Sequence, residues 1–521
     1  MTFEDLFERH GPSYRWLATT TMLFGLVALG MSITIVDVAT PYIEGAFGMS
    51  VSQEQWLSTG FLAATTISIM VAPWMANRFG NRATYLGTLI LFLVASIAGG
   101  ISSSSFVIIL SRVGLGAATG LIRPVAMEVL IVAFGQRRKG VAMAIYGMSL
   151  GLPLTLASVL GGWLVETLHW RAVFYAPIPF CLISLVLAWL YLPNARSKNA
   201  GRFDWLGLVL LSIAIFALLT ALANWYRWGP NSNDILLSLL MTGVCTIAFI
   251  VWELRCPAPL IELRIFLQPV FASAAVAVFL FGGVFYGIVF LLPLFVEAVQ
   301  GYSPLEAGLL FLPSTLVLAV LVPIVGPLSD RYSPVLFAVP ATLIACVGIW
   351  MMAHAGLNTS FSTLALAMAL VAVGMAGFPP PVLATSIGSL PKHLVHYGAG
   401  VINFALQLGG ALITSLAVLF LDKSSTIHAA HMAQALTSAN SILLHYLHQL
   451  QGMLAHLGVA AGLLGAGAMH ILGQATWTEA YVLGFRYNFL LVLFALVASL
   501  LPTVLIEVFR RRRKAYRQSS A

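Results

Sequence analysis

Two arginines and a glutamate lie inside one long apolar stretch of the sequence. Arg112, Arg123 and Glu128 are the charged residues of segment 106–132. Charged side chains are costly in hydrocarbon, so they usually face protein or water and mark functional sites. At about 100° and 1.5 Å per residue, Arg123 lies about 20° around the helix from Arg112 and about 16 Å along it. We therefore predict that both arginines face the protein interior.

The same stretch contains residues that allow close helix packing. Gly116 and Gly120 follow Arg112 at a spacing of four residues, so a neighbouring helix can approach this face. Pro124 cannot donate the hydrogen bond that the Gly120 carbonyl would normally accept. That oxygen is expected to lie free beside Arg123.

The composition indicates a polytopic helical membrane protein. Of the 521 residues, 60% are hydrophobic and only 8% are charged, whereas soluble domains carry about 25% charged residues. The net charge of +8 lies in short loops, where it indicates membrane orientation and not a nucleic-acid partner. The four cysteines suggest no disulfide framework.

The hydropathy pattern predicts fourteen transmembrane helices. They are expected at about 16–38, 55–76, 83–101, 106–132, 141–164, 171–192, 205–224, 234–252, 271–297, 305–327, 335–355, 361–384, 398–421 and 485–508. An even number places both termini on one side. That side holds twenty of the 26 Lys and Arg residues and the opposite side four, so we predict cytoplasmic termini.

These spans define the expected domain organisation. It comprises a cytoplasmic N-terminal segment (1–15), a six-helix half (16–192), two linker helices (205–252), a second six-helix half (271–508), a periplasmic helical insertion within it (422–481) and a basic cytoplasmic tail (509–521). Residues 457–473 could form a fifteenth span, but this would move the basic tail outside, against the charge rule.

An internal repeat with an offset of 253 residues relates the halves. Ser50 and Gln53 correspond to Ser303 and Glu306, and each pair is a candidate helix-capping box. The offset also places residues 77–78 onto residues 330–331. Two such halves are typical of secondary transporters.

Leucines spaced by four and three residues form a seam within the insertion. They are Leu443, Leu447, Leu450, Leu454 and Leu457. The seam could dock a partner helix or pack back on this protein's own membrane domain. Six histidines of the insertion (428, 431, 445, 448, 456 and 470) have no nearby cysteine or acid, so no metal site is predicted.

Three motifs make the family resemblance specific. They are FLLPLFVEAVQGYSPLEAGLLFLP (Phe290–Pro313), HWRAVF (His169–Phe174) and NFALQLGG (Asn403–Gly410). The chain resembles the fourteen-span drug:proton antiporters of the major facilitator superfamily, the EmrB/QacA type. This resemblance implies an inner-membrane exporter powered by the proton gradient, without a cofactor. It also implies a periplasmic membrane-fusion adaptor and an outer-membrane channel as partners.

The cytoplasmic loops depart from the family pattern GxLADRxGR. The first copy reads PWMANRFGNR, with Asn77 in place of the aspartate, whereas the second copy retains Asp330. A charged gate should therefore depend more on the second copy. The gate residues that the resemblance implies are Asn77, Arg78, Gly80, Arg82, Asp330 and Arg331.

Two spans depart as well. The fifth-span antiporter motif is expected to act through Gly147, Pro153, Gly161 and Gly162, with its proline moved to Pro153. In the first span, Ser32 replaces the usual acid and Asp37 stands at the usual asparagine position. The fourth-span motif R-x-x-Q-G keeps Arg112 and Gly116.

These residues favour a proton-coupled antiporter that exports amphipathic, anionic or weakly acidic compounds. Arg123 would attract the anionic headgroup, Asp37 could form an ion pair with Arg112, and Glu128 could pass on a proton. Ser32 completes the predicted cavity and coupling set. Cavity acids could also come from Glu297 or Glu166 near span ends, which would favour cations instead. The alternative is a membrane-embedded partner protein whose insertion is its main functional element. An intramembrane enzyme is disfavoured, because the sequence offers no nucleophile or metal cluster within the spans.

Overall fold

The computed structural model describes residues 7–8, 11–49, 51–135, 138–193, 203–229, 231–257, 259–391, 394–435, 441–457 and 460–519. Helices joined by short turns make up the described part of the chain, which contains no strand. The α-helices are α2 (Tyr14–Phe47), α3 (Val51–Phe79), α4 (Asn81–Gly100), α5 (Ser105–Phe134), α6 (Lys139–Thr167), α7 (Ala172–Tyr175), α8 (Ile178–Tyr191), α9 (Trp205–Ala223), α10 (Trp225–Trp228), α11 (Asn233–Arg255), α12 (Pro269–Gln300), α13 (Pro304–Leu309), α14 (Leu312–Ser329), α15 (Pro334–Ala353), α16 (Phe361–Gly377), α17 (Pro379–Gly388), α18 (Val395–Ala435), α19 (Ser441–His456), α20 (Leu464–Ala498) and α21 (Leu500–Ser519).

Fourteen segments of the described chain are long and apolar enough to cross a membrane, as predicted. Most agree with the expected spans to within a few residues. The last differs, since it runs from Leu464 to Arg512 instead of 485–508. It is longer because α20 begins inside the insertion and continues into the bundle without a break.

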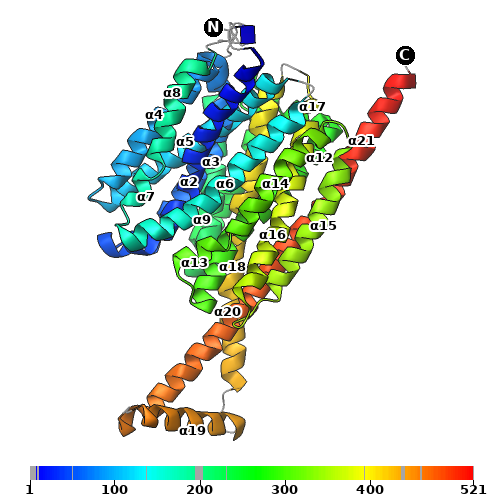
Figure 1. Ribbon diagram of the computed structural model, residues 1–521. Helices are drawn as coiled ribbons and strands as arrows, with labels where there is room; N and C mark the ends of the chain where they lie inside the picture. The colour runs from blue at the N-terminus through cyan, green and yellow to red at the C-terminus, as the bar shows by residue number, and fades with distance from the viewer. Residues whose placement is uncertain are drawn as a thin grey trace.

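The helices form two packed halves that lie side by side (Figure 1). In the first half α2 packs on α5, α6 and α8, and in the second half α12 packs on α18, α20 and α21. Across the boundary, α6 contacts α13, α14 and α17, while α18 contacts α3 and α5. α2 begins and α21 ends at the same end of the bundle (Figure 1). Which side of the membrane this end faces remains a prediction.

A capping box at the second copy of the internal repeat begins α13. The Ser303 hydroxyl accepts from the Glu306 N–H at 3.2 Å, and the Glu306 carboxylate accepts from the Ser303 N–H at 2.8 Å. The prediction for this copy is therefore confirmed. Ser50, the cap of the first copy, lies outside the described residues.

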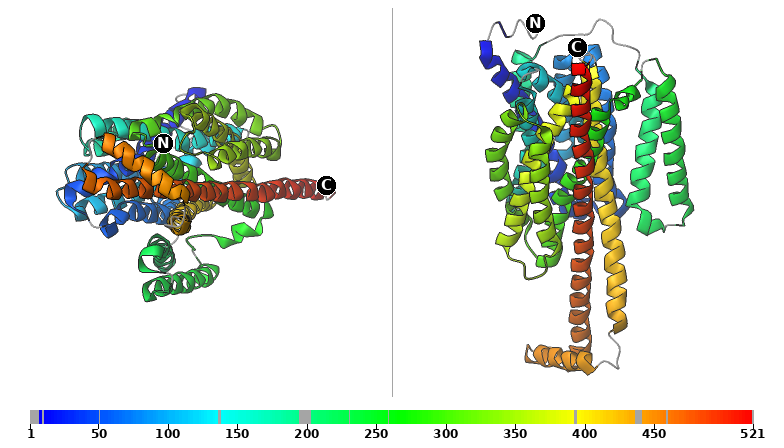
Figure 2. Two further views of the ribbon diagram at one scale, coloured as in Figure 1. Left: turned by 90° about the horizontal axis from the view of Figure 1, so that it is seen from below. Right: turned by 90° about the vertical axis from the view of Figure 1, so that its right-hand side faces the viewer.

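The linker helices α9 and α11 form a hairpin at the edge of the bundle (Figure 2). α9 packs on α3 and α18 as well as on α11. Most side chains of α11 are exposed, which suits an apolar helix that faces lipid. The hairpin therefore adds to the bundle without separating its halves.

The insertion projects beyond the end of the bundle opposite to the C-terminus (Figure 1). Its sides are continuations of α18 and α20, and α19 lies across the tip. The insertion is thus built from extended membrane helices. The basic residues after 508 likewise continue α21 as far as Ser519.

Candidate functional site

Helix α5 carries the predicted arginines because small residues let it lie directly against α3. A Cβ atom added at Gly116 would meet the Phe61 carbonyl oxygen, and one at Gly120 would meet that of Thr65. The Thr65 hydroxyl also donates to the Gly116 carbonyl at 3.1 Å. The close approach expected from these glycines is therefore present.

Each of the three guanidinium nitrogens of Arg112 makes a hydrogen bond within the first half. Its Nη2 lies 2.9 Å from Asp37 Oδ1, its Nη1 donates to the Ser32 carbonyl at 2.8 Å and its Nε donates to the Leu57 carbonyl at 3.0 Å. Its guanidinium also lies 4.5 Å from the centre of the Phe61 ring. The side chain is 1% exposed. Arg112 therefore joins α2, α3 and α5.

The expected ion pair between Asp37 and Arg112 is present, and its two members differ in access to solvent. The Asp37 side chain is 49% exposed, and its Oδ1 also accepts from the Ser58 hydroxyl at 3.4 Å. Ser32 contributes its backbone carbonyl to Arg112, while its hydroxyl donates to Leu29. The carboxylate is thus the accessible end of an otherwise buried cluster.

Arg123 has a different environment at the boundary between the halves. Its Nη1 donates to Gln407 Oε1 of α18 at 2.5 Å, and the arginine is 2% exposed. Among the described residues, no carboxylate lies within ion-pair distance of Arg123. Its positive charge is therefore buried with a neutral amide as its hydrogen-bond partner.

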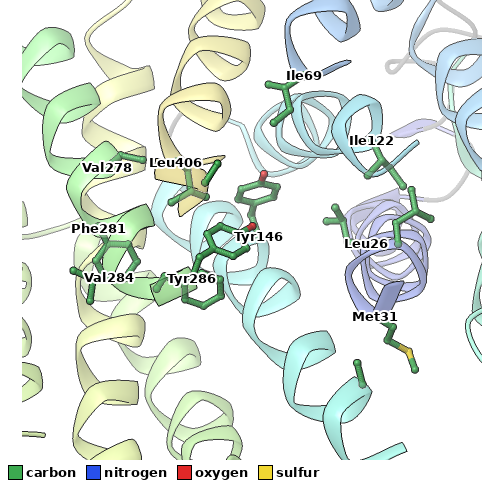
Figure 3. Close-up of a cluster of buried hydrophobic side chains, with 14 of the residues drawn as sticks. Leu26, Met31, Ile69, Ile122, Tyr146, Val278, Phe281, Val284, Tyr286 and Leu406 are labelled. Atoms are coloured by element: carbon green, nitrogen blue, oxygen red, sulfur yellow. The ribbon is translucent and has the colours of Figure 1, made fainter. Parts of the chain in front are cut away.

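A second polar contact crosses the same boundary one helical turn away. The Tyr146 hydroxyl of α6 donates to Asn403 Oδ1 of α18, and Asn403 Nδ2 donates to Met127 Sδ of α5 at 3.2 Å. Tyr146 also lies next to Tyr286 of α12 (Figure 3). Helices of both halves therefore meet around Tyr146.

An apolar pocket opens beside this contact. Its empty volume is about 580 Å³, including the open space at its mouth. The lining residues are Tyr146, Gly147, Leu150, Gly151, Val278, Phe281, Phe285, Leu318, Met375, Phe378, Pro379, Leu383, Ile402, Asn403 and Leu406. Figure 3 shows three of these lining residues, Phe281 of α12, Leu406 of α18 and Tyr146 of α6. The pocket is thus shared by both halves.

The structure separates residues that the sequence analysis grouped in one cavity. Ser32, Asp37, Arg112, Arg123 and Glu128 are all absent from the lining of this pocket. The first three form the cluster within the first half. Arg123 lies closer to the pocket, since Gln407, its partner, follows the lining residue Leu406.

Asn403 and Gln407 were missed as site residues, although both lie in the quoted motif NFALQLGG. Their spacing of four residues places both amides on one face of α18. Both are at most 2% exposed. Two amides at this spacing in an apolar span were the available signal.

Glu128 lies at the other end of α5, against the start of α4. Its carboxyl group is within hydrogen-bond reach of the Asn81 side chain. Asn81 belongs to the first-copy loop motif. The structure therefore connects this acid with the loop after α3.

The first-copy loop contributes turn geometry and a ring contact. Gly80 has φ +90°, a conformation that favours glycine. Arg82 lies 4.7 Å from the centre of the Trp189 ring. Asn77 is half-buried and Arg78 is exposed. These contacts lie within the first half.

The second-copy loop reaches across the boundary. Asp330 Oδ1 accepts from the Gly140 N–H, at the start of α6, at 2.5 Å. A carboxylate is favourable at a helix N-terminus, where N–H groups are free. Arg331 is exposed. The retained acid therefore joins the halves, whereas the altered first copy does not.

Helix α6 follows the expected small-residue pattern. A Cβ atom at Gly161 would lie 3.1 Å from the Ile35 side chain, and one at Gly162 would lie 2.9 Å from the Leu305 nitrogen. Gly147 lines the pocket. Pro153 lies inside the continuous helix and contacts Gly30. These residues let α6 pack on both halves.

The leucine seam contacts this protein's own α20. Leu447, Leu450 and Leu454 are half-buried, and Leu454 Cδ1 lies 3.0 Å from a Cβ atom added at Gly467. Leu457 lies beyond α19 and is 76% exposed. The side chain of Leu443 lies outside the described part. The described part of the seam thus packs on α20 of the same chain.

The comparisons with known proteins agree with this architecture. Residues 22–414 match the Major Facilitator Superfamily. The chain is 27% identical to the multidrug export protein EmrB of Haemophilus influenzae, covering 87% of this chain and 88% of that protein. It is 29% identical to the tetracenomycin C resistance and export protein of Streptomyces glaucescens, with 81% and 78% covered.

A solved structure supports the fold independently. The human organic anion transporter MFSD10 superposes with a TM-score of 0.54 at 15% identity, covering 92% of this chain and 99% of that one. The family match spans more than half of the sequence. The chain therefore belongs to the major facilitator superfamily, as a multi-pass inner-membrane transporter.

Proposed function

We propose that this transporter exports anionic or weakly acidic amphipathic compounds in exchange for protons, by alternating access. The observation that carries the proposal is the environment of Arg123. This buried cation has a neutral amide as its hydrogen-bond partner, and no described carboxylate lies within ion-pair distance. A buried charge without a counter-charge is costly, and a bound anion would offset that cost.

The neighbouring pocket suits the rest of such a compound. Phe281, Phe285, Leu318 and Phe378 supply apolar surface, and Tyr146 and Asn403 supply its polar atoms. Ligand pockets commonly combine an apolar lining with a few polar groups that fix orientation. An apolar tail would occupy the pocket while its acidic headgroup turns toward Arg123.

The names of two relatives support export of small molecules. One is a multidrug export protein, and the other exports tetracenomycin C. The anionic preference rests on Arg123 in this chain. The human structural neighbour has too low a sequence identity to inform the substrate.

Proton coupling is assigned to Asp37, with Glu128 as the second candidate carrier. Asp37 is half-exposed, so a proton can reach it, and it holds one of the three acceptors that engage Arg112. Protonation would remove the charge from that acceptor but leave the two carbonyl bonds. Arg112 would then shift its position without losing all of its partners.

The decisive experiment measures transport in vesicles containing the purified protein under an imposed pH gradient. One anionic and one cationic fluorescent compound of similar size are compared, with Arg123→Gln as the variant and Arg264→Gln, at an exposed residue, as its control. Loss of a charge-assisted hydrogen bond costs about 1.5–3 kcal/mol, so affinity for the anion should fall about 10- to 100-fold. Preference of the unaltered protein for the cation would refute the proposal.

The same variant addresses the alternative that the insertion, not transport, is the main function. A membrane-embedded partner protein would keep its activity after Arg123→Gln. Equal loss of acidic and neutral substrates would instead indicate a packing role for Arg123.

We further assign the projecting insertion to docking of a periplasmic adaptor in a two-membrane export system. The support is its projection beyond the bundle and the exposed side chains around α19. Deleting 441–457 should abolish resistance in intact cells and leave transport in vesicles unchanged. Loss of both would show that α19 serves the transporter's own fold through α20.

A further inference from the structure

Two buried carboxyl groups meet where the linker helices join the bundle. Asp204 precedes α9, and its Oδ1 accepts from the Gly207 N–H at 2.9 Å and from Trp252 Nε1 at 2.8 Å. Glu253 lies in the last turn of α11, and its Oε2 accepts from the Ile261 N–H at 3.3 Å. Asp204 is 7% exposed and Glu253 is 4% exposed. Each acid thus has one oxygen engaged and one remaining.

The two remaining oxygens face the same small space. Asp204 Oδ2 and Glu253 Oε1 are buried without a hydrogen-bond partner among the described residues. A Cβ atom added at Gly207 would meet Asp204 Oδ2 and would lie 2.9 Å from Glu253 Oε1. Glycine at this position therefore lets the two carboxyl groups approach each other.

None of the described charged groups around the pair compensates its charge. The charged groups that act on Glu253 are Asp204 and Glu262, both acidic. Glu262 is itself 3.9 Å from Arg264, which is 81% exposed, and it also faces Tyr397 of α18.

On the side of α3, the ring of Trp74 packs on Phe203, and Arg78 is exposed. Arg255, at the end of α11, is exposed as well. No described cation comes within 4 Å of either buried acid. Two ionised carboxylates in this position would repel each other.

We propose that Asp204 and Glu253 bind one proton between them, as a carboxylic acid whose O–H donates to the free oxygen of the other carboxylate. The pair then carries a single negative charge, which three N–H donors stabilise. The shared proton fastens the first turn of α9 to the last turn of α11 and to the segment that leads into α12. This proton site is separate from Arg123 and does not depend on the transported compound.

Infrared spectroscopy of the purified full-length protein tests the proposal, together with its melting temperature as a function of pH. At neutral pH the protonated-carboxyl band should decrease in Asp204→Asn and in Glu253→Gln. It should stay unchanged in Asp234→Asn, a control in the first turn of α11. Raising the pH should lower the melting temperature of the unaltered protein. That shift should be lost in Glu253→Gln, whose amide N–H can replace the shared proton.

Three results would overturn the proposal. The protonated-carboxyl band of both variants could equal that of the unaltered protein. The pH-dependent shift in melting temperature could also persist in Glu253→Gln. A chelator could also lower the melting temperature of the unaltered protein but not of Glu253→Gln, which would show that a metal cation occupies the pair. Should the variants not fold, alkaline titration of the unaltered protein must remove part of the band as the melting temperature falls; a constant band would refute the shared proton.

Discussion

Arg112 and Arg123 lie on one helix, are equally buried and face different partners. Arg112 binds one carboxylate and two carbonyls within the first half. Arg123 binds one amide of the other half. A buried arginine that has a counter-charge and a hydrogen bond from each nitrogen stabilises a fold, whereas one with a single neutral partner at the boundary between the halves can recognise a ligand. The difference is therefore one of hydrogen-bond satisfaction.

The largest expected effect separates the two arginines by stability. Arg112→Met removes three hydrogen bonds from a charged donor and leaves Asp37 without its counter-ion. We expect a loss of about 3 kcal/mol in the free energy of unfolding. Arg123→Met, the matched control, also removes a buried charge and should change stability by less than about 1 kcal/mol. Denaturant unfolding in detergent measures both, and similar losses would contradict the distinction.

A second prediction concerns the accessible end of the Arg112 cluster. Asp37→Asn keeps an oxygen near Arg112 but can no longer gain and lose a proton. Proton-driven transport should fall about tenfold or more, as is usual when a proton-transfer group is removed, while substrate binding changes little. Transport rates at several external pH values, compared with equilibrium binding, test this. An unchanged pH dependence would remove Asp37 from coupling.

A third prediction sharpens the role assigned to the amide partner. Gln407→Leu leaves Arg123 in place but removes the hydrogen bond that holds its Nη1. Affinity for an acidic substrate should therefore fall by a few-fold, less than in Arg123→Gln. The double variant should resemble Arg123→Gln alone, because contacting residues act non-additively. Asn488→Leu serves as the control, because Asn488 is a buried amide of α20 that is absent from the pocket lining. Additive losses in the double variant would mean that Gln407 acts on the substrate independently.

The smallest effect is expected at the second-copy loop. Partial burial against α6 raises the pKa of Asp330 above its ordinary value. The ionised form is therefore disfavoured in the folded protein, and stability should increase slightly as the pH falls through that raised pKa. Asp330→Asn keeps an oxygen for the Gly140 N–H, so this pH dependence should disappear, with a change below about 1 kcal/mol. Melting temperatures of both proteins across mildly acidic pH provide the measurement; an identical slope would assign the effect to another group.

The sequence predicted the fold because spanning helices depend on local composition. Runs of about twenty apolar residues must cross the membrane as helices, and the glycine spacing on α5 correctly indicated close packing. The Asp37–Arg112 contact could also be predicted from the sequence, since few groups can pair with a buried arginine.

The pocket could not be predicted from the sequence, because it depends on which helices of the two halves meet. Asn403 and Gln407 are ordinary amides until α18 is placed against α5 and α6. The beginning of the last span was misplaced for another reason: α20 already begins at Leu464, inside the insertion, and the weakly apolar residues there give no boundary signal.

α18 connects the boundary between the halves with the projecting insertion. This helix carries Gln407 in the bundle and runs without interruption for 41 residues into the projecting hairpin, a length of about 60 Å. α18 contacts Arg123 through Gln407, within the bundle, and its far end lies near α19 (Figure 1). A tilt of α18 by a few degrees, when the halves exchange contacts, would displace the tip by several ångströms. A change of contact at Arg123 would therefore be expected to move the tip of the insertion.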